Sequence, residues 1–129
     1  MNKDTARRVM LAAGAKATEV GKPASIAIVD IAGCMVLFER FNNASSWTAL
    51  IAEGKATGSA FTGRDSARLA ESTSTRLAEM LAGRRFVPAQ GAVPIVDGSG
   101  VIGGIGVSGS SPQEDEDIAR AGAAAIALS

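Results

Sequence analysis

The sequence contains no histidine and no tyrosine, and only 4% of its residues are aromatic. Without histidine, the chain lacks the side chain that proteins use most often as a general base, a metal ligand and a haem ligand. With so few aromatic rings, it also lacks the stacking surfaces that hold single-stranded nucleic acid. These absences exclude His-based catalysis and argue against a nucleic-acid partner.

The sequence also has no excess charge and only one cysteine. Lys and Arg together number 13, as do Asp and Glu, so there is no general attraction to nucleic acid or anionic membranes. Cys34 stands alone, which excludes an intrachain disulfide. The N-terminal segment is charged where an export signal would be apolar, and no run approaches the roughly 20 apolar residues that span a bilayer. We therefore expect a cytoplasmic protein with no membrane partner.

What the chain does contain is ordinary globular composition. It has 129 residues, of which 47% are hydrophobic and 20% are charged, and this predicts a single domain over residues 1–129. Small residues dominate, which favours close packing between elements or between subunits. We expect a homo-oligomer, at least a dimer, which light scattering on a sizing column would detect.

The first half of the chain predicts a helix, a hairpin and two more helices. Asn2 or Asp4 can cap the first helix, and Gly21 fits its end. Two apolar runs, residues 25–30 and 34–41, are separated by a turn as short as a β-hairpin requires. Either serine of residues 45–46 can cap a helix to about residue 61. Gly54 and Gly58 within that helix indicate that another backbone packs closely there, and a further helical stretch covers residues 65–81.

The second half predicts strands followed by a helix. Phe86 and Val87 are interpreted as a short edge strand. Residues 92–96 and 101–107 flank a good hairpin turn, and Pro94 indicates an edge or irregularity. A capping box at residues 111–114 begins the last helix. Two hairpins joined through helices predict an α+β fold with a mainly antiparallel sheet.

Several polar residues have two interpretations. Asp30, with Glu39 and Arg40 on the returning strand, can form a carboxylate pair beside a cation, but a turn-capping Asp and a cross-strand ion pair are favoured. Cys34 on a strand is more typical of a small buried residue than of a nucleophile, since no base is available to activate it. Residue types and spacing alone therefore lead to an α+β fold with an anion-binding pocket as the candidate site.

Four stretches, read in order, are similar to the motifs of one known family. They are SIAIVDIAG at residues 25–33, FERFNNA at 38–44, IAEGKA at 51–56 with Phe61 downstream, and QGAVPI at 90–95 followed by VIGGIGVSG and Glu116-Asp117. The match covers nearly the whole chain. On these residues the sequence resembles the GlcG-like or HbpS-like family, which includes the haem-binding HbpS and the C-terminal domain of PduO.

This resemblance implies a profilin-like fold, with a five-stranded antiparallel sheet between helices, that assembles into dimers or larger rings. It also implies a small-ligand pocket where the matched stretches meet. Some members bind or are said to degrade haem, and others are associated with glycolate, diol or aromatic catabolism. The pocket residues that the resemblance implies here are Arg40, Asn43, Lys55, Gln90 and Gly91.

The chain departs from the family pattern at three positions. Cys34 stands where many members have His, Gln90 where many have an acid, and Ala92 where the motif has its second glycine. The family's haem ligand therefore cannot be transferred to this sequence. Because no histidine is available as an axial ligand, we expect any haem to bind weakly.

Three functions follow as alternatives. The first is an accessory protein of catabolism that holds a small organic carboxylate, an anionic partner, through Arg40 and Lys55. The second is a haem-binding or haem-sensing protein, with haem as a possible cofactor. The third is a lyase, isomerase or hydrolase acting on a small catabolic intermediate, with Lys55 as base or with Asp30 or Glu53 as acid, because burial can lower a lysine pKa enough for that work.

Overall fold

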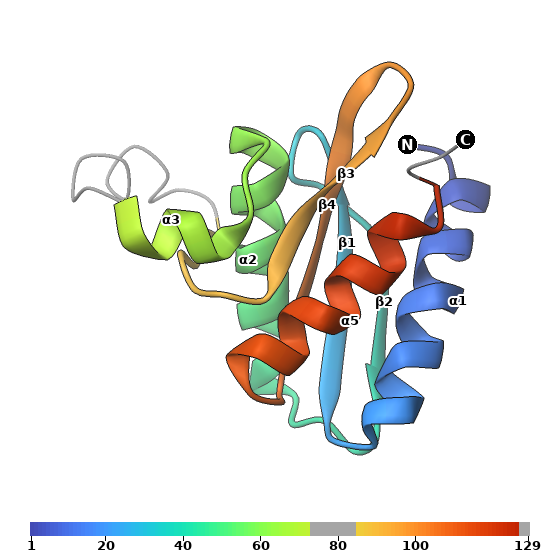
Figure 1. Cartoon of the computed structure of the whole chain (residues 1–129), viewed down its shortest axis with the longest axis vertical. Helices are drawn as coiled ribbons and strands as arrows, with labels where there is room; N and C mark the ends of the chain where they lie inside the picture. Colours follow the sequence, from blue (N-terminus) through green and yellow to red (C-terminus); the bar gives the residue numbers. More distant parts are fainter. Residues whose placement is uncertain (73–84, 127–129) are drawn as a thin grey trace.

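The computed structural model describes residues 1–72 and 85–126 of the chain. Within these residues, four strands form one antiparallel sheet in the order β2-β1-β4-β3 (Figure 1). Helices α1 and α5 pack on one face of the sheet and α2 packs on the other. This arrangement confirms the predicted α+β class. The elements in chain order are α1 (Lys3–Val20), β1 (Ala24–Asp30), β2 (Met35–Phe41), α2 (Trp47–Thr62), α3 (Ser66–Ser72), β3 (Ala92–Asp97), β4 (Gly100–Ser108) and α5 (Pro112–Ala124).

Helix α1 begins and ends at the predicted residues. The Asn2 side chain accepts a hydrogen bond of 2.8 Å from the Thr5 N–H, which satisfies one of the free donors of the first turn. Gly21 is left-handed, with φ of 75°, and its N–H donates to the Ala17 carbonyl, as in many helix ends. The face predicted to be apolar is buried against the sheet and α5, at Ala6, Val9, Met10, Ala13 and Ala17.

Both predicted hairpins are present. Strand β1 pairs antiparallel with β2, and β3 pairs antiparallel with β4 across the turn at residues 97–100. Strand β1 also pairs with β4, which joins the two hairpins into one sheet. Strand β3 lies at the sheet edge, where Pro94 is tolerated because an edge strand does not need every N–H for pairing.

The expected fifth strand is wrong for the described residues. Residues 85–88 have no regular secondary structure, and Phe86 and Val87 cover α2 instead of pairing with the sheet. A Cβ atom added at Gly54 would lie 2.5 Å from the Val87 side chain, and one added at Gly58 would lie 2.9 Å from the Phe86 ring. These two glycines therefore make room for this segment. The predicted close approach of another backbone is found at Gly54, next to the Val87 nitrogen, whereas at Gly58 the close neighbours are side chains. The helix expected over residues 65–81 is present as α3, and the rest of that expectation lies outside the described residues.

Bulky aliphatic side chains fill the space between the sheet and the pair α1 and α5. Ile26 and Ile28 from β1 and Ile105 from β4 are fully buried there, together with Ile118 from α5. Burying a side chain of this size stabilises the folded state by about 1.5–3 kcal/mol. This cluster is the main hydrophobic core.

The opposite face of the sheet carries small residues under α2. Gly104 and Gly106 of β4 leave no space for side chains, because a Cβ atom on either would overlap the α2 backbone at Ala56 or Ala52. Among the described residues, the buried apolar cluster on this side is small and consists of Val29, Ala56 and Ala60. Helix α2 therefore lies so close to the sheet that its backbone contacts the backbone of β4. This contact fixes the position of the α2 side chains relative to the sheet.

Helix α5 begins with the predicted capping box. The Ser111 hydroxyl accepts from the Glu114 N–H, the Glu114 carboxylate accepts from the Ser111 N–H, and Pro112 occupies the first turn. The turn before the helix is thereby fixed, which matters for the residues that follow it. Across residues 1–72 and 85–126, no helix combines the length and apolar character needed to cross a membrane.

Candidate functional site

A pocket of about 600 Å³ opens where α2, the segment before β3, the end of β4 and the start of α5 meet. This volume lies in the range of small-ligand pockets, roughly 300–1,000 Å³. Its lining combines apolar prolines and alanines with hydroxyl groups and one ion pair. Among the lining residues are Trp47, Thr48 and Lys55 from α2, Pro88 to Gln90, Ser108 from β4, and Asp115 from α5.

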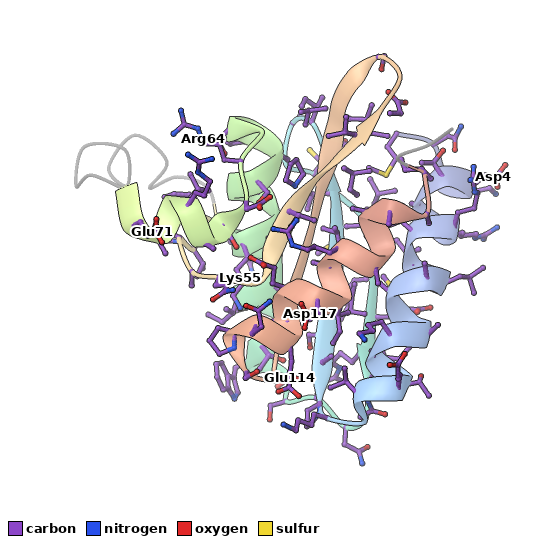
Figure 2. The ribbon with its side chains drawn as sticks, in the orientation of Figure 1. Asp4, Lys55, Arg64, Glu71, Glu114 and Asp117 are labelled. Atoms are coloured by element: carbon purple, nitrogen blue, oxygen red, sulfur yellow. The ribbon has the colours of Figure 1, made fainter. Side chains whose placement is uncertain are left out.

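The ion pair joins Lys55 to Asp115. The Lys55 ammonium nitrogen lies 3.5 Å from the Asp115 carboxylate, and the two side chains are only 6% and 4% exposed. The ammonium group also donates a hydrogen bond of 2.9 Å to the Val107 carbonyl. In Figure 2, Lys55 lies on α2 on the side where α5 begins. Two oppositely charged groups from separate helices are thus buried together beside the pocket.

Gly91 closes the ion pair from the side of β3. A Cβ atom at this position would lie 2.8 Å from the Lys55 nitrogen, 2.6 Å from the Val107 carbonyl oxygen and 3.1 Å from the Asp115 Cβ. Its φ of 135° is also one that other residues rarely adopt. The predicted pocket glycine is therefore required by both space and backbone conformation.

The start of α5 holds Asp115 in place. The second carboxylate oxygen of Asp115 accepts a hydrogen bond of 3.0 Å from the Ser110 N–H, and the Asp115 N–H donates to the Ser111 carbonyl. The aspartate is therefore held by the turn that the capping box fixes. Its carboxylate faces Lys55 with a defined orientation.

Burial shifts the proton affinity of both partners. It lowers the pKa of the Lys55 amine below its usual value, although the charge of Asp115 acts in the opposite direction. Burial likewise raises the pKa of the Asp115 carboxyl, against the influence of Lys55 and the Ser110 N–H. Each shift favours the uncharged form, so less free energy separates the ion pair from a neutral amine and acid than in water.

Hydroxyl groups line the approach to the pair. Thr48 forms a hydrogen bond of 2.7 Å with the buried Ser25 hydroxyl and donates to the Ser45 carbonyl. Ser25 lies opposite Ser108 in the sheet, and Ser108 also lines the pocket. At the rim, Gln90 donates a hydrogen bond of 3.3 Å to Gln113.

The five predicted pocket residues do not all line the same pocket. Lys55 and Gln90 line the pocket, and Gly91 contacts the Lys55 amine. Arg40 and Asn43 instead line a separate hollow of about 360 Å³ with Ala44. The reason is topological, because Arg40 lies on the edge strand β2 and β1 separates it from β4.

Of the catalytic candidates, only Lys55 lines the pocket. The Asp30 carboxylate accepts hydrogen bonds of 2.9 and 3.0 Å from the Ala32 and Cys34 N–H groups, which is the turn-capping role favoured from sequence. Glu53 forms an ion pair of 3.5 Å with Arg85. Neither acid lies among the described lining residues.

Cys34 is exposed, so its interpretation as a buried residue is wrong. It directly follows the tight turn at residues 31–33, whose backbone bonds to Asp30 hold the turn outside the sheet. Within the described ranges, no three His, Cys, Asp or Glu side chains are placed to hold a metal ion.

Sequence reasoning missed Asp115 and Trp47. Asp115 follows the capping box in the first turn of a helix, where negative charge is favoured in any case, so the sequence gives no reason to pair it with Lys55. The available signal was that a buried lysine needs an acid, but Asp30 and Glu53 were nearer in sequence. Trp47 is 65% exposed at the start of α2 and lines the pocket. The usable signal in the sequence is that it is the single tryptophan of a chain with few aromatic residues.

The fold and the pocket together define a small α+β protein with a preformed cleft over a lysine–aspartate pair. The family model described as "Haem degrading protein HbpS-like" matches residues 1–124, so the chain belongs to the HbpS-like family. Among curated proteins, none matches the sequence.

Solved structures show the same fold. The "PduOC:Heme Complex" is 25% identical, with 98% of this chain and 94% of that chain covered and a TM-score of 0.86. A double mutant of HbpS from Streptomyces reticuli is 27% identical, with 96% and 85% covered and a TM-score of 0.83. The protein ORFY of Klebsiella pneumoniae, at 22% identity, covers 97% and 89% with a TM-score of 0.85, and this likeness concerns the fold alone.

Proposed function

We propose that the chain binds haem, with the pocket between α2 and α5 as its site. Membership of the HbpS-like family and the likeness to a solved haem complex support haem over other small ligands. We assign haem to this pocket because of the residues that line it. An exposed tryptophan stands at the opening, and a lysine lies among hydroxyl groups further in.

The lining suits the organic part of haem. Trp47, with Pro88 and Pro112, offers apolar surface on which a flat porphyrin can stack. The carboxylates of haem can accept hydrogen bonds from hydroxyl groups such as that of Ser108. The Lys55 ammonium has three N–H donors, and two partners are found for them among the described residues.

The same lining does not supply the usual iron ligands. Haem iron is typically held by His, Cys, Met or Tyr. The chain has no His or Tyr, and none of the described lining residues is Cys or Met. Binding in this pocket therefore rests on the porphyrin and its carboxylates, which agrees with the weak binding expected from sequence.

The single tryptophan allows a direct test. Titration of hemin into the protein should quench Trp47 fluorescence and saturate at one hemin per chain, because a single pocket holds the hemin near the indole ring. Replacing Trp47 with Ala removes a stacking surface worth about 0.5–1.5 kcal/mol, so the Soret titration should show up to about tenfold weaker binding. Leu50→Ala is the matched control, because Leu50 is 52% exposed on the same helix and is not among the lining residues.

Two results would contradict the proposal. One is an absence of saturable quenching. The other is an equal loss of hemin affinity in Trp47→Ala and Leu50→Ala, which would indicate nonspecific adsorption to exposed apolar side chains.

A second candidate function, the binding of a small organic carboxylate, rests on Arg40. Its guanidinium donates only a long hydrogen bond of 3.4 Å, to the Ala44 carbonyl, and no carboxylate pairs with it among residues 1–72 and 85–126. Together with Asn43 it lines a hollow of about 360 Å³. Guanidinium groups hold carboxylates through two parallel hydrogen bonds, so an unpaired one favours such a ligand.

A thermal-shift screen of small carboxylates separates the two candidates. Under this second function, a stabilising acid should lose its effect in Arg40→Ala and keep it in Trp47→Ala. An unchanged response of Arg40→Ala would exclude the hollow as the binding site.

A further inference from the structure

We propose that Lys55 is a nucleophile that forms an imine with a small aldehyde or ketone entering the pocket. This inference goes beyond haem binding and does not depend on it, although it concerns the same pocket. It rests on the placement of an amine, a carboxylate and an open cavity together.

The first step of the argument is that the amine is both enclosed and reachable. Lys55 is 5% exposed, yet it lines a cavity of about 600 Å³ that reaches the surface near Trp47. Its nitrogen is held by the Val107 carbonyl at 2.9 Å and by Asp115 at 3.5 Å. A small carbonyl compound can therefore approach the nitrogen from the cavity while the protein fixes its other sides.

The second step is that Lys55 can lose its proton without help from histidine. Burial lowers the pKa of its amine, and the same burial raises the pKa of Asp115. Desolvation in an apolar surrounding is one of the ways by which proteins make a lysine nucleophilic. Asp115 is the group placed to accept the proton, because its carboxylate is the ion-pair partner of the ammonium.

The chemistry balances without any oxidant or cofactor. Asp115 takes one proton from the Lys55 ammonium, and the neutral amine then attacks the carbonyl carbon. The carbonyl oxygen gains a proton as the nitrogen loses one, which gives a carbinolamine. Asp115 returns its proton to the hydroxyl, the C–O bond breaks, and water leaves a protonated imine on Lys55. The ammonium and the carbonyl compound thus become an iminium ion and water.

The alternative is a purely structural pair that joins α2 to α5. A structural pair explains the ion pair and the bond to Val107, but it does not require the pair to line an open cavity. The two alternatives differ in one measurable property, which is the reactivity of the Lys55 amine compared with that of exposed lysines.

Reductive trapping measures that reactivity. The protein is incubated at neutral pH with limiting acetaldehyde and sodium cyanoborohydride, which reduces any iminium ion to a stable secondary amine in preference to the free aldehyde, and the labelled lysines are located by peptide mapping. A lowered pKa raises the unprotonated fraction of the amine at neutral pH, so Lys55 should carry severalfold more label than Lys16 or Lys22. Lys16 and Lys22 are suitable references because both form ion pairs at the surface, with Glu19 and Glu114.

Two variants test the assigned roles. Asp115→Asn keeps the shape of the side chain but cannot return a proton to the carbinolamine hydroxyl. Because the substitution also removes the charge that raises the pKa of Lys55, a fall in label at Lys55 would show that the lost proton transfer outweighs the gain in free amine. Lys55→Arg keeps a cation that can hold haem carboxylates but cannot form an imine. Hemin quenching in Lys55→Arg with no label at residue 55 would therefore separate this inference from haem binding.

The wild-type map decides the outcome even if a variant fails to fold. Preferential label on Lys55 supports the inference, and its loss in a natively folded Asp115→Asn supports the role of the carboxylate. Label on Lys55 no higher than on Lys16 and Lys22 would overturn the inference and leave the pair with a structural role.

Discussion

The two faces of the sheet carry different kinds of residue. On the side of α1 and α5, branched aliphatic residues such as Ile26 and Ile105 fill the space. On the side of α2, Gly104 and Gly106 let helix backbone touch strand backbone, and the buried groups there include Ser25 and Thr48. The first face has the apolar volume that stabilises a core, and the second has polar side chains at fixed positions.

The comparison shows how one sheet can serve two purposes. Close contact under α2 leaves little space that a bulky side chain could fill, so the helix is positioned by backbone contacts and not by aliphatic packing. The lysine that it carries is thereby held against α5 at the rim of the sheet. The backbone contacts that position α2 and the aliphatic packing of the other face can therefore be tested by separate substitutions.

The largest expected effect concerns the apolar face. Ile26→Ala should lower the free energy of unfolding by about 3 kcal/mol, because it removes a fully buried side chain and leaves a cavity. Urea denaturation measures this change. Ile31→Ala is the matched control, since Ile31 is 54% exposed and its loss should change stability by less than about 0.5 kcal/mol. Similar losses in both variants would contradict the assignment of the core.

The next effect concerns the close contact under α2. Gly106→Ala adds a Cβ that overlaps the Ala52 carbonyl, so α2 must move, and we expect a loss of about 2 kcal/mol. Gly98→Ala has no atom within 4 Å of the added Cβ and should be close to neutral. If Gly106→Ala were as stable as Gly98→Ala, α2 would not be held by backbone contact.

A smaller effect is expected from the buried hydroxyls. Ser25→Ala removes one hydrogen bond to Thr48, whose own hydroxyl still donates to the Ser45 carbonyl, so the cost should be about 1 kcal/mol. Ser99→Ala, in the exposed hairpin turn, serves as the comparison in the same denaturation series. A neutral Ser25→Ala would indicate that water replaces the lost bond.

The smallest effect is a dependence on pH. Because burial lowers the pKa of Lys55, the unfolded chain binds more protons than the folded chain between this lowered value and the ordinary lysine value. Stability should therefore rise with pH across that alkaline window. In Lys55→Met the rise should be absent, which denaturation midpoints at several pH values would show. An equal rise in both proteins would place its origin elsewhere.

Local features of the fold could be predicted from sequence, whereas contacts between distant elements could not. The caps at Asn2 and Ser111 and both hairpins are present because each depends on a few neighbouring residues. The expected fifth strand is not present among the described residues, because Phe86 and Val87 pack against α2 and do not pair with the sheet.

The candidate site divides in the same way. Lys55, Gln90 and Gly91 were named from motifs, but the pairing of Lys55 with Asp115 joins residues from separate helices and leaves no pattern in the sequence. Arg40 was expected beside Lys55 and lies by another hollow, because strand order is a property of the whole sheet. The homo-oligomer stays a prediction, which light scattering can test.

The capping box at Ser111 also fixes the rotation of α5 about its own axis, because it fixes the residue at which the helix begins. A helix advances by about 100° per residue, since about 3.6 residues complete each turn. If α5 began one residue earlier or later, the carboxylate of Asp115 would swing about a quarter of a turn away from Lys55. The length of the short link between Ser108 and Pro112 therefore determines whether Asp115 faces Lys55. Single-residue insertions or deletions there should spare the sheet and α2 while disconnecting the lysine from its acid.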